Sequence, residues 1–246
     1  MNKGKENNGA ITKECKNRLL RDIMQIMKCP LVDSGIYYSH SEENMMKGYA
    51  LIIGPKDTPY FGGFYFFMFD FPYDYPFSPP TVTYMTNNGS TRFHPNFYKN
   101  GKVCVSILNT WAGEKWSSCQ SISSVLLTLC SLFTENPLLN EPSITLQHKD
   151  VIPYSKTISF VNIHYSFCEM TQRQPIPFSI FREIIVELFL KNYEEIYQKV
   201  LLEIENNNNN EEIIVVQIYF METQINYNLL KEKLEKTKEL IMSYDL

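Results

Sequence analysis

The sequence lacks several features that assign proteins to a membrane, a secretory route or a metal-binding class. No apolar run among its 246 residues reaches the roughly 18 residues that a membrane-spanning helix needs. The first ten residues contain no apolar stretch typical of a signal peptide. No pair of cysteines, and no cysteine with a histidine, has the spacing of a zinc site. We therefore expect a cytoplasmic or nuclear protein with six free thiols, no membrane partner and no metal.

An excess of basic residues is absent as well. The formal net charge is −4, which argues against a nucleic-acid partner. Residues 176–246 contain 7 Lys or Arg and 13 Asp or Glu, a net charge of −6, whereas the preceding residues contain 16 and 14, a net charge of +2. This change coincides with the proline-rich stretch Gln174–Pro177. The pattern predicts a flexible N-terminus at 1–10, a domain at 11–174 and a C-terminal extension at 175–246.

Apolar residues make up 44% of the chain and aromatic residues 14%, which is enough to build a folded core. Helical spacing of apolar residues predicts helices over 12–28, 121–133, 151–172, 179–204 and 226–244. Runs rich in β-branched and aromatic residues predict strands over 35–39, 49–53, 64–69, 81–85 and 213–216. The first four strands follow one another closely, which favours an antiparallel meander in an α+β fold. The asparagine run at 206–210 predicts a mobile loop.

The first predicted helix is amphipathic, with an apolar stripe and a polar stripe that includes basic residues. The apolar stripe consists of Leu19, Leu20, Ile23, Ile26 and Met27, and the basic residues are Arg18, Arg21 and Lys28. A stripe of this kind predicts that one side of the helix packs on the domain while the other faces solvent.

The segment 87–119 is irregular, and a long loop inside a compact domain usually has a functional role. It contains Cys104, whereas most of the other cysteines belong to predicted helices, where each is most simply a small buried hydrophobe. A loop cysteine taken alone is also most simply an ordinary thiol. The residues around Cys104 change that interpretation.

The chain reads His94-Pro95-Asn96, then an Asn-Gly turn, then Cys104 eight residues after Asn96. This block resembles the active-site block of ubiquitin-conjugating enzymes. Residues 74–80 resemble the Tyr-Pro-Phe-x-Pro-Pro loop of that family, and the matching blocks cover about residues 12–172. The resemblance implies the ubiquitin-conjugating fold, with an N-terminal helix, a four-stranded antiparallel meander and further helices. Here a mainly helical C-terminal extension follows it.

The sequence also departs from the common pattern of that family. Trp116 lies 12 residues after Cys104, several more than usual, and Ser118 stands where a proline is usual. The longer spacing, the Thr134-Glu-Asn-Pro137 segment and the C-terminal extension together resemble the Z-type ubiquitin-conjugating enzymes. Enzymes of that type accept ubiquitin and, in animals that have one, a second ubiquitin-like modifier.

The resemblance implies roles for the residues of the site. Cys104 would carry the modifier as a thioester, since a partly exposed loop thiol suffices for thioester exchange. The Asn96 side-chain amide would stabilise the oxyanion that forms when an amine attacks, or else hold the loop that stabilises it. His94 and Pro95 would shape the loop. Asn140 or Glu141 could be the gate residue that orients and deprotonates the incoming lysine. No cofactor is implied.

The resemblance also implies binding surfaces and partners. Arg18, Arg21 and Lys28 correspond to the basic face that meets the activating enzyme, although a solvated helix face would look the same. The residues that correspond to the ligase-binding loops are Pro76, Phe77, Trp116 and Ser118. The implied partners are ubiquitin or a ubiquitin-like protein, an activating enzyme and ubiquitin ligases.

Two other functions remain open at this point. The first is a non-catalytic ubiquitin-binding module of the same fold, which the presence of both Cys104 and Asn96 disfavours. The second is a cysteine hydrolase that uses His94 or His164 as its base. Such an enzyme would cleave an ester or a ubiquitin C-terminal amide without any activating enzyme.

Overall fold

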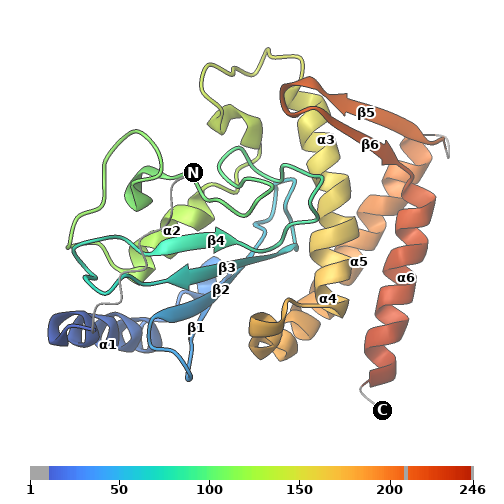
Figure 1. Cartoon of the computed structure of the whole chain (residues 1–246). Coiled ribbons are helices and arrows are strands. Elements are labelled where there is room, and N and C mark those ends of the chain that lie inside the picture. The colour runs from blue at the N-terminus through green and yellow to red at the C-terminus, as the bar shows by residue number, and fades with distance from the viewer. Residues whose placement is uncertain (1–10, 208–209, 245–246) are drawn as a thin grey trace.

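The computed structural model describes residues 11–207 and 210–244 (Figure 1). The flexible N-terminus expected at 1–10 and residues 208–209 of the asparagine run therefore lie outside the described residues. Within the described ranges, no helix is long and apolar enough to cross a membrane. In the same ranges, no group of three or more His, Cys, Asp or Glu side chains is placed to hold a metal ion.

The central sheet is the predicted meander. Its strands are β1 (Ile36–His40), β2 (Lys47–Ile53), β3 (Phe64–Asp70) and β4 (Thr81–Tyr84), and they pair antiparallel in that order. Phe64, Tyr65, Phe66 and Phe67 of β3 are all fully buried, although successive side chains of a strand point to opposite faces. The expected α+β fold is confirmed, and both faces of the sheet are covered.

The two faces of β3 are covered by different parts of the chain. On one face, Phe67 packs against Tyr84 of β4 and against Phe97 of the irregular segment, with ring centroids 5.5 and 5.2 Å away. On the other face, Phe66 packs against Phe178 of the extension, at 4.8 Å. The sheet therefore lies between the segment that leads to Cys104 and the C-terminal extension.

Helix α1 (Lys13–Lys28) begins after Thr12, whose side-chain oxygen accepts a hydrogen bond from the backbone N of Cys15 at 3.0 Å. Leu19 is buried as predicted. Leu20 and Met27 are exposed, so their assignment to the apolar stripe was wrong. The buried stripe is narrower because α1 packs mainly against α2 (Ile122–Ser131) at the edge of the molecule.

The helix predicted at 151–172 forms as α3 (Val151–Val161), a π-helical segment η4 (Asn162–Glu169) and a final turn α4 (Met170–Gln172). The π-helical segment seats Asn162 against the sheet. Its Oδ1 accepts from the Tyr65 hydroxyl at 2.6 Å, and its Nδ2 donates to the Phe61 carbonyl at 2.9 Å. A Cβ at position 63 would lie 1.9 Å from Asn162 Oδ1, so only glycine fits there.

The extension is built from two long helices and a hairpin. The elements are η5 (Ile176–Phe181), α5 (Arg182–Asn206), β5 (Glu212–Val216), η6 (Gln217–Tyr219), β6 (Met221–Ile225) and α6 (Tyr227–Tyr244). Strand β6 pairs antiparallel with β5, and the sequence analysis did not predict it. The loop predicted at 206–210 starts later, because Asn206 ends α5 and the Asn207 side chain donates to the Glu203 carbonyl.

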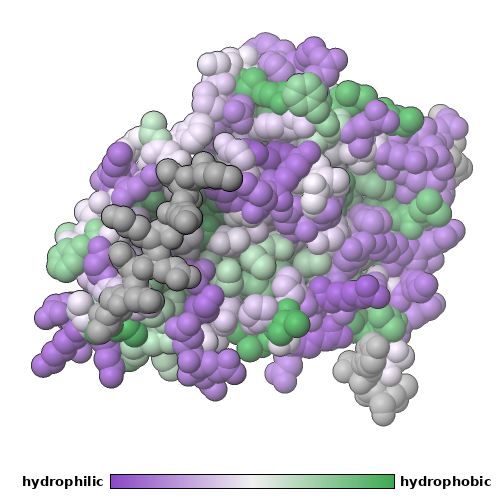
Figure 2. Space-filling model, in the orientation of Figure 1, coloured by the Kyte–Doolittle hydropathy of each residue, from purple (hydrophilic) through white to green (hydrophobic). Residues whose placement is uncertain are grey.

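The extension shares its apolar core with the rest of the molecule. Phe178 is fully buried and contacts Tyr49 of β2 as well as Phe66. Phe189 of α5 stacks on Phe167 of η4, with ring centroids 4.6 Å apart. Leu230, Leu234 and Ile241 of α6 are buried, and hydrophilic residues cover most of the α6 side of the face shown in Figure 2. Burial of these rings is the main force that holds the extension in place.

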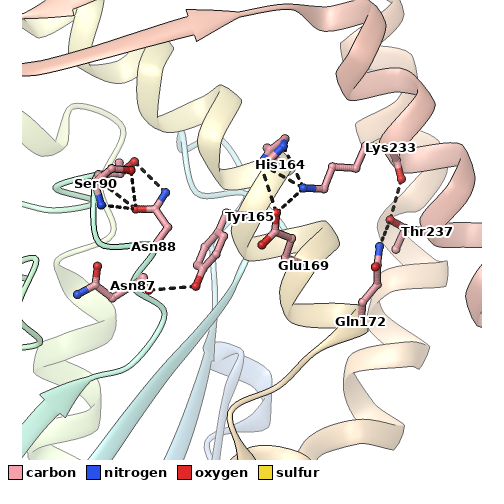
Figure 3. A network of polar contacts seen from close by, with 10 residues as sticks. Asn87, Asn88, Ser90, His164, Tyr165, Glu169, Gln172, Lys233 and Thr237 are labelled. Atoms are coloured by element: carbon pink, nitrogen blue, oxygen red, sulfur yellow. Dashed lines mark hydrogen bonds and ion pairs between the residues drawn. The ribbon is translucent and has the colours of Figure 1, made fainter.

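A polar network also joins α6 to η4 (Figure 3). Lys233 Nζ donates to Glu169 Oε1 at 2.5 Å and lies 2.9 Å from His164 Nε2. Burial, followed by the charge of Lys233, lowers the pKa of His164, so a neutral ring accepts this contact. Gln172 donates to Thr237 at 2.7 Å and so adds a link one turn further along α6.

Candidate active site

Cys104 follows a tight turn that positions it beside the His-Pro-Asn loop. The Tyr98 backbone N donates to the Lys102 carbonyl and the Gly101 N donates to the Tyr98 carbonyl, both at 2.9 Å. Gly101 has a φ of 86°, and a Cβ there would lie 3.0 Å from Thr83 of β4. The Asn-Gly turn expected from the sequence is thus required by both backbone conformation and space.

Asn96 and Cys104 are joined by two hydrogen bonds. The Cys104 backbone N donates to the Asn96 carbonyl at 2.9 Å, and the Asn96 side-chain Nδ2 donates to the Cys104 carbonyl at 2.5 Å. Asn96 Oδ1 is buried and has no hydrogen-bond partner among the described residues. The geometry is that of the loop-holding role. A catalytic contribution of Asn96 to the oxyanion stays a prediction.

Cys104 is 2% exposed, so the expectation of a partly exposed thiol was wrong for this conformation. Its chain neighbours Val103 and Val105 are buried, and the Thr110 hydroxyl bonds to both the N and the O of Val105. The segment 109–115 is thereby fixed to the residue after the cysteine. Cys104 is not among the residues that form the contiguous apolar core of the described residues.

His94 shapes the loop and does not serve as a base. It is fully buried, its Nε2 contacts the Leu132 carbonyl at 3.0 Å, and its Nδ1 accepts from the Asn96 backbone N at 3.0 Å. Burial lowers the pKa of His94 to about 3. Since both ring nitrogens are engaged, neither is free to take a proton from a thiol. Pro95 is buried beside it, and its carbonyl accepts from Arg92.

The buried His94 predicts acid sensitivity of the fold. The folded pKa lies below the ordinary value of about 6.5, so the unfolded chain binds a proton that the folded chain does not. Stability from this group is complete above pH 6.5 and is lost as the pH falls toward 3. We expect urea unfolding of His94→Gln to lack a slope of about 1.4 kcal/mol per pH unit that wild type shows below pH 6.5. Equal slopes in the two proteins would contradict the assignment.

The two candidate gate residues are engaged in other contacts. Asn140 Nδ2 donates to the Pro137 carbonyl at 3.1 Å within the short helix η3 (Pro137–Asn140). Glu141 Oε2 accepts from the Tyr219 hydroxyl of the extension at 2.5 Å. Their assignment as gate residues stays a prediction, and the Glu141 contact connects this segment to a residue that the sequence analysis did not consider.

Arg18 is not part of a free basic face. Its guanidinium pairs with Asp22 at 2.8 Å and donates to the Ser118 carbonyl at 2.6 Å and to the Gln120 carbonyl. These contacts span about 100 residues of chain and tie α1 to the loop that contains Ser118. Arg21 and Lys28 are exposed, as expected of a docking face.

The residues assigned to the ligase-binding loops lie together. Trp116 Nε1 donates to the Pro76 carbonyl at 2.7 Å, and the Trp116 ring lies 5.9 Å from that of Tyr75. Phe77 is 72% exposed, so its ring is not packed into the core. Ser118 is exposed and presents its carbonyl to Arg18. These contacts leave Phe77 free for a partner.

Arg92 is a residue of this site that the sequence analysis missed. It lies two residues before His94 and donates to the carbonyls of His94 and Pro95, at 3.1 and 2.5 Å. Its position next to the His-Pro-Asn block was the available signal. Tyr219, which also reaches the site, gave no such signal because it lies far along the chain in the extension.

Comparison with known proteins agrees with this geometry. The family model described as ubiquitin-conjugating enzyme matches residues 18–160. Over 185 residues the chain is 45% identical to the ubiquitin-conjugating enzyme E2 Z of Homo sapiens, covering 74% of this chain and 51% of that protein. For the protein of the same name from Xenopus tropicalis, the identity is 43% over 190 residues, 76% of this chain and 60% of that protein.

The resemblance to Z-type enzymes expected from the sequence is confirmed by these similarities. The chain spans about 51 to 60% of the length of these curated relatives. The family model covers more than half of the chain and includes Asn96, Cys104 and Trp116. On these grounds the chain belongs to the ubiquitin-conjugating enzyme family.

Proposed function

We propose that this chain accepts ubiquitin, or a ubiquitin-like protein, from an activating enzyme as a thioester on Cys104. It then passes the modifier to a ligase or to a substrate lysine. The proposal rests on the paired hydrogen bonds between Asn96 and Cys104, which fix the backbone of a loop cysteine, while both ring nitrogens of the nearby His94 are engaged and cannot act as a base. A carrier needs such a site because thioester exchange is close to thermoneutral.

The chemistry asks little of the protein beyond position. In the first step the Cys104 sulfur attacks the carbonyl carbon of the incoming thioester, a new C–S bond forms, and the activating enzyme's thiolate leaves. In the second step a lysine amine attacks the same carbon, the C–S bond breaks, and Cys104 leaves as a thiolate. The surplus proton of the amine passes to water or to a gate residue. Charge that builds up on the carbonyl oxygen is where a nearby donor would help.

The test is incubation of the full chain with an activating enzyme, ATP and ubiquitin, followed by electrophoresis with and without a reducing agent. A band that is larger by one ubiquitin and disappears on reduction supports the proposal. The same assay with a second ubiquitin-like protein and its activating enzyme addresses modifier choice. Failure to form any adduct with a competent activating enzyme would overturn the proposal.

A cysteine hydrolase finds less support. His94 is buried and fully bonded, and His164 belongs to the network with Lys233 and Glu169 between η4 and α6 (Figure 3). Among the described residues, the hydrogen bonds and ion pairs of that network do not include Cys104. Release of a chromogenic ester or a ubiquitin C-terminal amide without an activating enzyme would reverse this preference.

The exposed face of α1 is the proposed docking site of the activating enzyme. Arg21 and Lys28 lie beside exposed Leu20 and Met24, and together they line a shallow groove of about 570 Å³. We expect Arg21→Glu with Lys28→Glu to slow charging by roughly tenfold at low salt, because charge complementarity mainly sets the association rate. Charging kinetics with limiting activating enzyme provide the measurement.

The matched control reverses two exposed lysines of the extension, Lys191 and Lys236, which changes the net charge equally. Added salt should slow charging of wild type but affect the Arg21/Lys28 variant less, because exposed charges are screened within about 10 Å at 0.1 M. Arg18 is left unchanged, since its replacement would break the contacts to the Ser118 loop. Equal charging rates of the two double variants would mean that this face of α1 is only a solvated helix surface and does not bind the activating enzyme.

We also propose that ligases contact the surface around Phe77 and Trp116. The exposed Phe77 ring and the bond from Trp116 to the Pro76 carbonyl support this assignment. Trp111 of the segment 109–115 is also 43% exposed on the same irregular region.

A cytoplasmic or nuclear location belongs to the same proposal, and fractionation of cells tests it.

A further inference from the structure

The His-Pro-Asn loop is held from outside by one arginine. The guanidinium of Arg92 donates from Nε to the His94 carbonyl and from Nη2 to the Pro95 carbonyl. These are the two peptide groups directly before Asn96. A planar guanidinium that bonds two carbonyls fixes their direction, which a single-point donor such as lysine cannot do as well. The orientation of Asn96 therefore depends on where the Arg92 side chain lies.

Aromatic rings hold Arg92 in turn. Its guanidinium carbon lies 3.3 Å from the ring centroid of Tyr98 and 5.4 Å from that of Tyr219. The Arg92 backbone is fixed as well, because its carbonyl accepts from the Tyr154 hydroxyl at 2.8 Å. Met221 Sδ of β6 accepts from the Arg92 backbone N at 3.1 Å. The extension thus contacts both the side chain and the backbone of Arg92.

Tyr219 links Arg92 to the segment that contains the candidate gate residues. Its hydroxyl donates to Glu141 Oε2 at 2.5 Å, and its ring packs edge to face on Tyr154, 5.6 Å between centroids. Burial and the Glu141 carboxylate raise the pKa of Tyr219, so the hydroxyl keeps its proton at neutral pH. One side chain of the extension therefore contacts both Arg92 and Glu141.

The hairpin turn that carries Tyr219 is anchored at its base. The Ile218 backbone N donates to Asp150 Oδ2 at 2.8 Å, and Asp150 is 3% exposed at the start of α3. Lys149 also contacts the Gln217 side chain. A turn fixed at this point can hold Tyr219 in one place, as a supporting residue of an active site must be held.

We propose that Arg92 and Tyr219 are positioning residues for acyl transfer. Tyr219 of the extension fixes Arg92 and Glu141, and Arg92 fixes the carbonyls of His94 and Pro95, so that Asn96 keeps the arrangement that amine attack requires. This inference rests on the proposed function and adds to it a role for a residue outside the matched conjugating domain. Small misplacement of reacting groups is costly, about 10²-fold for roughly 1 Å.

The test uses the full chain charged with ubiquitin, with the activating enzyme then inactivated, and follows discharge against the concentration of free lysine. Tyr219→Phe removes only the bond to Glu141, and Arg92→Lys removes the two-carbonyl contact but keeps the charge. We expect the maximal discharge rate to fall roughly threefold or more in Tyr219→Phe and roughly tenfold in Arg92→Lys. The lysine concentration at half-maximal rate and the rate of charging should change less than twofold.

Two controls separate positioning from general loosening of the extension. Tyr197→Phe removes a bond of the same kind, Tyr197 to Glu235 at 2.6 Å between α5 and α6, and should discharge like wild type. Combining Tyr219→Phe with Glu141→Ala should slow discharge no more than Glu141→Ala alone, because both act through one bond.

The outcomes are distinct. A wild-type chain that forms no Cys104 adduct overturns the proposed function, and the positioning role with it. A wild type that charges and discharges, with Tyr219→Phe and Arg92→Lys equal to it, overturns the positioning role alone. So does an equal loss in Tyr197→Phe and Tyr219→Phe, or a parallel loss of charging, discharge and melting temperature in the two test variants. Selective loss of discharge supports the role.

Discussion

Replacing Cys104 with alanine is expected to abolish formation of the reductant-labile ubiquitin adduct completely. The thioester carbonyl must be bonded to a sulfur, and alanine offers none. Cys104→Ser should instead give an adduct that survives reducing agent, because an oxyester does not exchange with thiols as a thioester does. The measurement is the non-reducing gel described above, with charging followed over time.

The chain supplies matched controls for this experiment. Cys29 and Cys119 are exposed thiols, whereas Cys104 is buried in the conformation described here. Cys29→Ala and Cys119→Ala should charge like wild type, although their sulfurs are the more accessible ones. An adduct of unchanged intensity in Cys104→Ala, or its loss in Cys119→Ala, would mean that another thiol carries the modifier.

Replacing Asn96 with alanine is expected to slow discharge onto free lysine by about 10²-fold or more, the typical cost of losing one oxyanion donor. Charging should be nearly normal, because thiol exchange has a lower barrier to begin with. Single-turnover rates of the two half-reactions, measured on the same preparation, give the comparison.

The hydrogen bond from Asn96 to the Cys104 carbonyl makes this result informative. If Asn96 only holds the loop, its loss should disturb charging and discharge equally. Asn96→Asp tests the donor directly, because the shape is kept while the amide N–H groups are replaced by a carboxylate oxygen. Discharge by Asn96→Asp at the wild-type rate would rule out a donor role of any kind.

The order of the sheet and the position of the active-site cysteine could be predicted from the sequence, because both follow from local pattern. Strand β3 begins with four consecutive aromatic residues, Phe64 to Phe67, and the His-Pro-Asn block stands at a fixed spacing from Cys104. Strand β6 was not predicted because only its first and last residues are apolar, and the three residues between them are polar. Only the partner β5 makes such a segment a strand, and pairing is not a property of the segment itself.

Side-chain roles that depend on distant partners could not be predicted. Arg18 looks like a solvated residue of an amphipathic helix, and only the folded chain brings it to the carbonyls of residues 118 and 120. The same holds for the Tyr219 hydroxyl and Glu141, which are 78 residues apart in sequence. Burial of Cys104 is likewise a result of packing, since a loop sequence does not say what lies over it.

The position of Phe178 against the rear of the sheet has a consequence for how the chain folds. A fragment that ends at Gln174 would expose Phe66 and Tyr49 to water on a face that Phe178 covers in the full chain. Such a fragment should be prone to self-association even where its thiol still accepts ubiquitin. We therefore expect the family domain and the extension to unfold together in one transition, and a fragment without the extension to melt at a lower temperature than the full chain.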